Sequence, residues 1–166
     1  APTEELHQMA LDLVTDIVKD EQKLKQLAIP ERFWDAVKES VDRRDVHLYG
    51  RMDFSYDGKN PAKLLELNYD TPTALFETGF FQWVWLEDLQ RRGFVSKHAA
   101  QFNSLQDKLI DAFTRMPLKQ PFYFASVRES LEDKGTVDYL MDLALQAGID
   151  ARYTALEDIG DIDGQL

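Results

Sequence analysis

The sequence contains no cysteine among its 166 residues. Disulfide bonds, thiolate metal sites and cysteine nucleophiles are therefore excluded within it. A chain without disulfides suits a reducing compartment, and we expect a cytoplasmic protein. Long apolar runs are also absent, because no stretch approaches the roughly 18 uninterrupted apolar residues that a membrane-spanning helix needs. Residues 1–5 lack the basic and apolar regions of a signal peptide, so we expect none.

Basic residues are scarce as well. Lys and Arg number 19 against 30 Asp and Glu, which gives a formal net charge of −11. The excess is concentrated near the C-terminus, because residues 129–166 hold 10 acidic and 2 basic residues. This balance argues against binding a nucleic-acid backbone or an anionic membrane surface, since both attract clustered Lys and Arg. We expect neither nucleic acid nor membrane among the partners.

Apolar material is plentiful by contrast. Hydrophobic residues make up 44% of the sequence, with 10 Phe, 6 Tyr and 3 Trp, so a packed core is expected. Apolar periodicity predicts helices over 4–27, 31–41, 73–92 and 102–116. The helix over 73–92 is apolar on most faces, which indicates burial or a covering partner. Packing is favoured over ligand stacking as the role of its aromatic cluster.

Residues 117–166 follow a different pattern. A buried strand is predicted over 121–127 and a second strand over 149–156, with a helix over 131–146 that Gly148 closes. Strand, helix and strand over this distance indicate a βαβ unit with parallel strands. The acidic, turn-rich residues 157–164 predict a loop. We therefore expect a mixed α/β protein with a helical and hairpin portion over 1–116 and a βαβ portion over 117–166.

The segment 48–70 carries the pattern with chemical content. Two alternating runs flank the turn residues Asp57 and Gly58, which predicts a β-hairpin. Side chains alternate in a strand, so one face of the hairpin is apolar and the other is polar. The polar face carries Arg51, Asp53, Glu66, Asn68 and Asp70. A hairpin that is symmetric about its turn pairs position 53 with 66 and position 51 with 68.

Opposed carboxylates at positions 53 and 66 need a compensating charge, which Arg51 or a divalent cation can supply. Two carboxylates with the Asn68 amide oxygen form an all-oxygen ligand set of the kind that Mg²⁺ accepts. Thr71 and Thr73 follow at an expected helix N-terminus, a place that favours an anion. The alternative is a solvated sheet with cross-strand ion pairs and Thr71 as a simple N-cap. Spacing alone favours this alternative.

Other polar residues give weaker signals. The three histidines have no metal-ligand spacing. Glu132 and Asp133 suit the first turn of the helix over 131–146, where acids are favoured. Gly135 belongs to neither common phosphate-loop pattern. No nucleophile–base pair is identifiable by spacing.

The hairpin and its surroundings resemble the glutathionylspermidine synthase family, and most closely its bacterial synthase-like members. The resemblance rests on RMDF at 51–54 and LLELNYDTPT at 64–73. It continues through 77–88, 101–106, 132–136 and 158–160, and so covers nearly the whole chain. Over 51–77 it is specific enough to outweigh the solvated-sheet alternative. It implies an ATP-grasp carboxylate–amine ligase, in which ATP phosphorylates the glycine carboxylate of glutathione and a polyamine nitrogen attacks the acyl phosphate.

The resemblance also implies roles for the hairpin residues. Carried over by position, Asp53, Glu66 and Asn68 are the Mg²⁺ ligands. Arg51 is the catalytic residue, and steadies the transferred phosphoryl group and the acyl phosphate. These roles agree with the oxygen-rich ligand set, because phosphoryl transfer needs charge neutralisation and positioning more than covalent chemistry.

Substrate contacts follow in the same way. Thr71 and Thr73 stand where the synthetase has serines that contact the glutathione peptide, and the added methyl groups leave the peptide's identity open. Glu132 matches a further glutathione-contacting acid. The expected substrates are therefore a glutathione-like peptide and a polyamine-like amine, with Mg²⁺ and ATP as cofactors.

Family members are far longer than this chain. Their lid and ATP-clasping lysines would follow Leu166, and an extension would precede Ala1. We therefore expect an incomplete ATP-grasp ligase, with half a catalytic site, a pre-ATP-grasp-like βαβ unit and no activity on its own. The alternative is a non-catalytic module whose apolar helix 73–92 packs on a partner protein and whose acidic C-terminal portion binds a basic or polyamine ligand.

Overall fold

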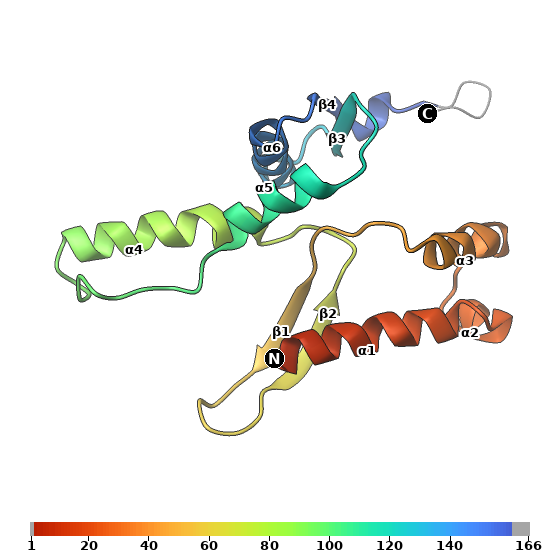
Figure 1. Ribbon diagram of the computed structural model, residues 1–166, viewed down its shortest axis with the longest axis horizontal. Coiled ribbons are helices and arrows are strands. Elements are labelled where there is room, and N and C mark those ends of the chain that lie inside the picture. The colour runs from red at the N-terminus through yellow and green to blue at the C-terminus, as the bar shows by residue number, and fades with distance from the viewer. Residues whose placement is uncertain (1, 161–166) are drawn as a thin grey trace. The chain divides into compact units, whose positions relative to one another are not determined.

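The computed structural model describes residues 2–160 (Figure 1). They fall into two compact units, the first holding residues up to His47 together with Met52–Leu67. The second holds Leu48–Arg51 and the chain from Asn68 onward. Helices and two small sheets make this a mixed α/β protein, as expected. Over the described residues, no helix has the length and apolar character to cross a bilayer.

The first unit begins with helices. They are α1 (Pro2–Ile17), α2 (Glu21–Gln26), the 3₁₀ turn η1 (Glu31–Phe33) and α3 (Trp34–Arg43). The prediction of a single helix over 4–27 is wrong, because the helix is interrupted at Asp20. The backbone of Asp20 is extended, and its carboxylate accepts from the backbone N–H groups of Gln22 and Lys23 at 2.9 and 3.3 Å. An aspartate that caps a new helix competes with continuation of the old one.

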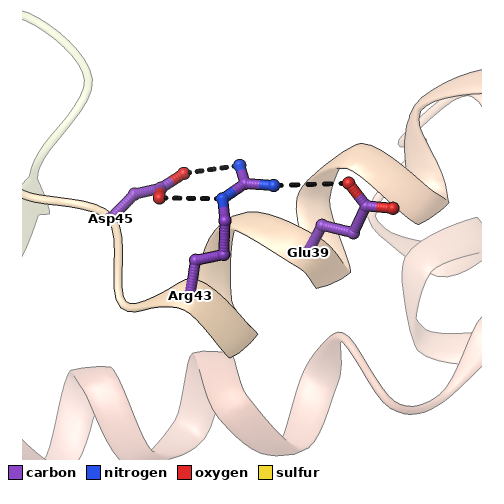
Figure 2. Close-up of polar contacts among 3 residues, drawn as sticks. All are labelled: Glu39, Arg43 and Asp45. Atoms are coloured by element: carbon purple, nitrogen blue, oxygen red, sulfur yellow. Dashed lines mark hydrogen bonds and ion pairs between the residues drawn. The ribbon is translucent and has the colours of Figure 1, made fainter.

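Helix α3 ends at a charged cluster that Figure 2 shows. Arg44 adopts a left-handed conformation with φ of 54°, which stops the helix. The Arg43 guanidinium then bonds Asp45 through two nitrogens, at 3.1 and 2.8 Å, and reaches Glu39 at 3.3 Å. The bond from Arg43 lowers the pKa of the Asp45 carboxyl. All three side chains are exposed, so the cluster orders this helix end more than it stabilises the fold.

The predicted hairpin is confirmed. Strands β1 (Arg51–Ser55) and β2 (Lys63–Asn68) form a two-stranded sheet, and the short connection makes them antiparallel. Asp57 organises the turn, since its Oδ1 accepts from the backbone N–H groups of Lys59 and Asn60 at 2.9 and 2.8 Å. These bonds, with one from the Asn60 side chain, lower the pKa of Asp57 to about 2. Gly58 has a φ of 80°, which explains why glycine follows the aspartate.

The second unit contains the predicted βαβ arrangement, with parallel strands. Its elements are the π-helical turn η2 (Glu77–Phe81), α4 (Gln82–Arg91), α5 (Leu105–Arg115), β3 (Phe122–Ser126), α6 (Leu131–Gln146), β4 (Ala151–Ala155) and the 3₁₀ turn η3 (Leu156–Asp158). The β3–β4 register pairs Phe122 with Ala151 and Ser126 with Ala155. Helix α6 has the predicted bounds, because Ser130 caps its start and Gly148, at φ of 85°, follows its end.

Packing of α5 and α6 on the β3–β4 sheet forms the core of the second unit. Leu109 and Phe113 come from α5, Phe124 comes from β3, and Leu143 from α6 is fully buried. Leu75, which lies just after the hairpin and Thr73, is also fully buried in this core. The segment that leaves the hairpin is therefore anchored to the best-packed part of the second unit.

Two sequence predictions for this unit can be compared with the structure. The helix over 73–92 was expected to be buried or covered by a partner, and Phe81 at the end of η2, with Trp83 and Trp85 of α4, is 52, 48 and 65% exposed in that order. The π-helical turn η2, which precedes this helix, packs on α5. The loop expected over 157–164 begins with the single 3₁₀ turn η3 at Leu156–Asp158, and residues 161–164 lie outside the described part of the chain.

Candidate functional site

The predicted site residues of the hairpin lie on its two neighbouring strands. Arg51 is the first residue of β1, and the half-buried Asp53 follows two positions later. The exposed Glu66 lies on β2, whose last residue is Asn68. Their places on adjacent strands match the hairpin hypothesis. The pairing of position 53 with 66 stays a prediction.

Asn68 shows an unusual feature for an amide side chain. Its Oδ1 atom is buried and accepts no hydrogen bond within the described residues. A buried acceptor without a partner costs about 1–3 kcal/mol, so a donor or a cation beside this oxygen would be stabilising. A hard divalent cation fits this oxygen, because Mg²⁺ prefers carboxylate and amide oxygens.

Carboxylates alone do not make a metal site here. Over residues 2–160, no three His, Cys, Asp or Glu side chains gather closely enough to hold a metal ion. A cation held by Asp53 and Glu66 therefore needs a third donor of another kind. The unpartnered amide oxygen of Asn68 is such a donor, and oxygens of a bound phosphate could complete the shell.

The structure brings Arg51 and Thr73 together. Arg51 Nη1 donates a hydrogen bond to Thr73 Oγ1 at 2.7 Å, although the residues are 22 positions apart. Since the Thr73 oxygen accepts from the guanidinium, its own hydrogen remains to be donated to an acceptor such as a carbonyl or carboxylate. One predicted catalytic residue and one predicted substrate-binding residue thus share a hydrogen bond.

The expected helix N-terminus at Thr71 and Thr73 is wrong. The helix begins only at Leu75, because Ala74 has a φ of 62° and so cannot belong to a right-handed helix. The Leu75 N–H donates to the Pro72 carbonyl at 3.3 Å, which makes this segment a tight turn. Thr71 is exposed and Thr73 is half-buried in or beside that turn. The two threonines therefore precede the helix and do not lie in its first turn.

A second close contact joins the same two segments of the chain. A Cβ atom added to Gly50 would lie 2.4 Å from Cδ1 of the Tyr69 ring. Glycine at position 50 therefore leaves room for the Tyr69 ring, which would have to shift for any larger residue. Partial burial raises the pKa of the Tyr69 hydroxyl. This close approach involves the residues next to Arg51 and Asn68 in the sequence.

Glu132 lies elsewhere in the fold. It is exposed in the first turn of α6, beside the Ser130 cap that accepts from the Asp133 N–H at 3.2 Å. Within residues 2–160 it makes no hydrogen bond or ion pair with another predicted site residue. An acid at this position stabilises a helix N-terminus in any case. The role of Glu132 in peptide binding stays a prediction.

The first unit has a hollow of its own, of about 770 Å³, lined by residues of α1 and by residues 40–47. Its lining includes Asp12, Asp42 and Asp45 together with Lys19 and Arg44, so its charges largely balance. None of the predicted site residues lines this hollow.

Sequence reasoning missed two contributors to the site. Tyr49 donates its hydroxyl hydrogen to the Thr73 carbonyl at 3.3 Å. Its place two residues before Arg51, in an extended segment, could have indicated a shared face. The left-handed backbone of Ala74 had no signal, because alanine does not favour that conformation.

The fold and this hairpin define the class of protein. A mixed α/β chain, with a polar hairpin followed by a βαβ unit, fits the preATP-grasp domain of a ligase. Residues 1–166 match the family described as Glutathionylspermidine synthase preATP-grasp. The chain therefore belongs to that family.

Three relatives illustrate the family. A Haemophilus influenzae protein named "Putative acid--amine ligase" is 38% identical over 162 residues, which cover 95% of this chain and 40% of that protein. The Escherichia coli bifunctional glutathionylspermidine synthetase/amidase is 28% identical over 99% of this chain and 26% of its own length. Trypanothione synthetase of Crithidia fasciculata is 28% identical over 51% of this chain and 13% of its own length. The chain thus spans less than half the length of these relatives.

Proposed function

We propose that this chain is the preATP-grasp part of an ATP- and Mg²⁺-dependent ligase that joins a peptide carboxylate to an amine. The peptide resembles glutathione and the amine resembles a polyamine. In the proposed reaction, the γ-phosphoryl group of ATP passes to a carboxylate oxygen of the peptide. The amine nitrogen then forms a bond to the carbonyl carbon as phosphate leaves, and the ammonium proton is lost to solvent or a base.

Asp53, Glu66 and Asn68 hold the metal in this proposal. The bound Mg²⁺ supplies charge neutralisation on the phosphate oxygens during transfer. The buried, unpartnered Oδ1 of Asn68 supports the assignment, because it lacks the partner that a cation would supply. Both carboxylates lie on strands of the same two-stranded sheet as Asn68.

In this proposal Arg51 steadies the transferred phosphoryl group and the acyl phosphate, and Thr73 binds the peptide. The guanidinium carries a fixed positive charge that stabilises negative oxygens on a carboxylate or phosphoryl group. The Thr73 hydroxyl, which accepts from Arg51, donates to the peptide. Thr71 and Glu132 contribute further peptide contacts. Their exposure leaves both side chains accessible to a substrate.

The hydrogen bond between Arg51 and Thr73 is the observation that carries the proposal. The two residues have different proposed partners, the phosphoryl group and the peptide, and they are far apart in sequence. A purely solvated hairpin face has no need to bind a threonine of the following turn. A site that aligns a carboxylate with a phosphoryl donor needs these two groups within reach of each other.

The test uses the full-length protein that contains this chain. Asp53→Ala and Glu66→Ala should each lower Mg²⁺-dependent phosphate release from ATP, in the presence of peptide and amine, by at least about 100-fold. The matched control is Asp57→Ala, which removes a carboxylate from the same hairpin at its turn and should retain turnover. Equal rates for all three variants and the wild type would restore the solvated-sheet hypothesis.

A second candidate function is a non-catalytic interaction module. The exposed aromatic residues of α4 favour it, because Trp83 and Trp85 are 48 and 65% exposed. A partner protein recovered at fixed stoichiometry, with no effect of nucleotide, would support the module. Protection of the full-length protein against heat by glutathione only when ATP is present would support the ligase instead.

A further inference from the structure

Thr73 is held in two ways by one short segment of the second unit. Its hydroxyl oxygen accepts from Arg51 at 2.7 Å, and its carbonyl oxygen accepts from the Tyr49 hydroxyl at 3.3 Å. Tyr49 itself packs against the core of the second unit. The tyrosine therefore links that core to the backbone of a proposed substrate-binding residue.

The backbone just after Thr73 is strained. Ala74 adopts a φ of 62°, a conformation that costs a residue with a Cβ atom about 1–2 kcal/mol. Such strain persists only where the surroundings determine the conformation more strongly than the local backbone does. On the C-terminal side, the fully buried Leu75 anchors the chain in the core. On the N-terminal side, the Tyr49 hydroxyl holds the carbonyl of Thr73.

We propose that Tyr49 is a positioning residue, whose hydroxyl holds the strained turn at Ala74 and thereby keeps the Thr73 hydroxyl on Arg51. Without that hydroxyl, the peptide unit between Thr73 and Ala74 can rotate and release the strain. Thr73 Oγ1 then leaves Arg51, and the guanidinium loses a contact that orients it. The consequence for catalysis rests on the proposed ligase function, whereas the effect on the turn does not.

The experiment compares Tyr49→Phe with Tyr153→Phe in the full-length protein. Both tyrosines are partly buried against the same core. Each hydroxyl makes a hydrogen bond, that of Tyr49 with the Thr73 carbonyl and that of Tyr153 with Ser126 Oγ at 3.2 Å. Loss of the Tyr49 hydroxyl should lower kcat/KM for the peptide about 3- to 10-fold, the range expected for one hydrogen bond. The KM for ATP should stay unchanged. The Tyr153→Phe variant should match the wild type in kcat/KM for the peptide and in KM for ATP.

A second measurement reports the conformation of the turn and does not depend on enzyme activity. Amide hydrogen exchange over residues 72–78 reports the bonds from the Leu75 N–H to Pro72 and from the Thr78 N–H to Ala74. Exchange in this segment should be faster in Tyr49→Phe than in Tyr153→Phe. If the wild-type protein shows no ATP-dependent ligation, the proposed function fails, and the exchange rates still decide the role of Tyr49.

A rescue separates strain from simple loss of packing. Ala74→Gly removes the steric cost of the left-handed conformation, so the turn no longer depends on the Tyr49 hydroxyl. The double variant Tyr49→Phe/Ala74→Gly should therefore recover most of the lost kcat/KM and the slow exchange. Three results would each overturn the proposal. In Tyr49→Phe they are amide exchange over residues 72–78 as slow as in the wild type, or an unchanged kcat/KM. The third is a double variant whose kcat/KM is as low as that of Tyr49→Phe.

Discussion

At the scale of single residues, two glycines are required for space and not for backbone freedom. Gly50 passes the ring of Tyr69, and the buried Gly79 passes the hydroxyl of Tyr139, where an added Cβ would lie 2.5 Å from the oxygen. The Tyr139 hydroxyl is buried and has no hydrogen-bond partner within the described residues. Burial also raises its pKa. Each glycine thus lets a tyrosine ring lie against a backbone segment.

Gly50 and Gly135 should respond in opposite ways to the same substitution. Gly50→Ala places a methyl group against the Tyr69 ring, and we expect a loss of about 1–3 kcal/mol in the free energy of unfolding. Gly135→Ala meets Phe76 only at 3.8 Å, an ordinary contact, and removes a glycine from the interior of α6. The free energy of unfolding of Gly135→Ala should therefore be about 0.5–1 kcal/mol higher than that of the wild type.

Urea denaturation of both variants and the wild type gives the comparison. A Gly50→Ala variant as stable as the wild type would mean that Tyr69 moves away at no cost. The close approach of Gly50 and Tyr69 would then make no contribution to the free energy of unfolding.

At the scale of elements, what is local in sequence was predictable. The bounds of α6 follow from the Ser130 cap and from Gly148, and the hairpin follows from its Asp-Gly turn. The break at Asp20 was missed, because the apolar periodicity of residues 4–27 continues across it while one side chain caps a new helix. Capping bonds of this kind override periodicity at single positions.

The hairpin turn should depend on pH through Asp57. Because bonds from Asn60 and Lys59 lower the pKa of this carboxyl from 3.8 to about 2, the ionised form stabilises the turn. That contribution is complete above pH 3.8 and is lost as the pH falls through about 2. NMR titration of the backbone amides of Lys59 and Asn60 should give a midpoint near pH 2.

The side chain in the Asp57→Asn variant cannot ionise. The backbone amide signals of Lys59 and Asn60 should therefore show no transition near pH 2 in this variant. A wild-type midpoint close to 4 would mean that the carboxylate does not hold the turn in solution. The turn would then rest on the left-handed conformation of Gly58 alone.

The candidate site was predictable as a residue list but not as a set of contacts. Alternation along β1 and β2 identified the polar residues, because side-chain direction in a strand follows from position. The bond from Arg51 to Thr73 depends on a left-handed alanine and on a tyrosine from another segment, which no local pattern specifies. Long-range contacts of this kind arise from the packed core around Leu75.

At the scale of the whole molecule, exposed apolar surface is the main feature. Leu65 on β2 is 70% exposed, and the aromatic residues of α4 are similarly accessible. The chain corresponds to 40% of the length of the Haemophilus influenzae relative. Exposed apolar area of this kind is commonly covered by further protein. We expect the remainder of a relative-sized protein to cover α4.

Tryptophan fluorescence can test this expectation. Trp83 and Trp85 are 48 and 65% exposed, whereas Trp34 is half-buried, with its indole N–H bonded to the Ile29 carbonyl at 2.8 Å. In single-tryptophan variants of the 166-residue chain, acrylamide should quench Trp83 and Trp85 more strongly than Trp34. In the full-length protein the difference should disappear or reverse. Equal quenching of Trp85 in both proteins would show that α4 stays uncovered, as the interaction-module hypothesis requires.

The pairing of β3 with β4 has a practical consequence for anyone handling the chain. Over residues 2–160 this sheet has two strands, so each strand has one edge whose backbone groups pair with no neighbouring strand. Parallel sheets are normally enclosed, and unpaired edges recruit strands from other molecules. Concentrated samples should therefore self-associate slowly through strand addition. Stock solutions are best kept dilute and well above the pI of 4.7, where like charges keep the molecules apart.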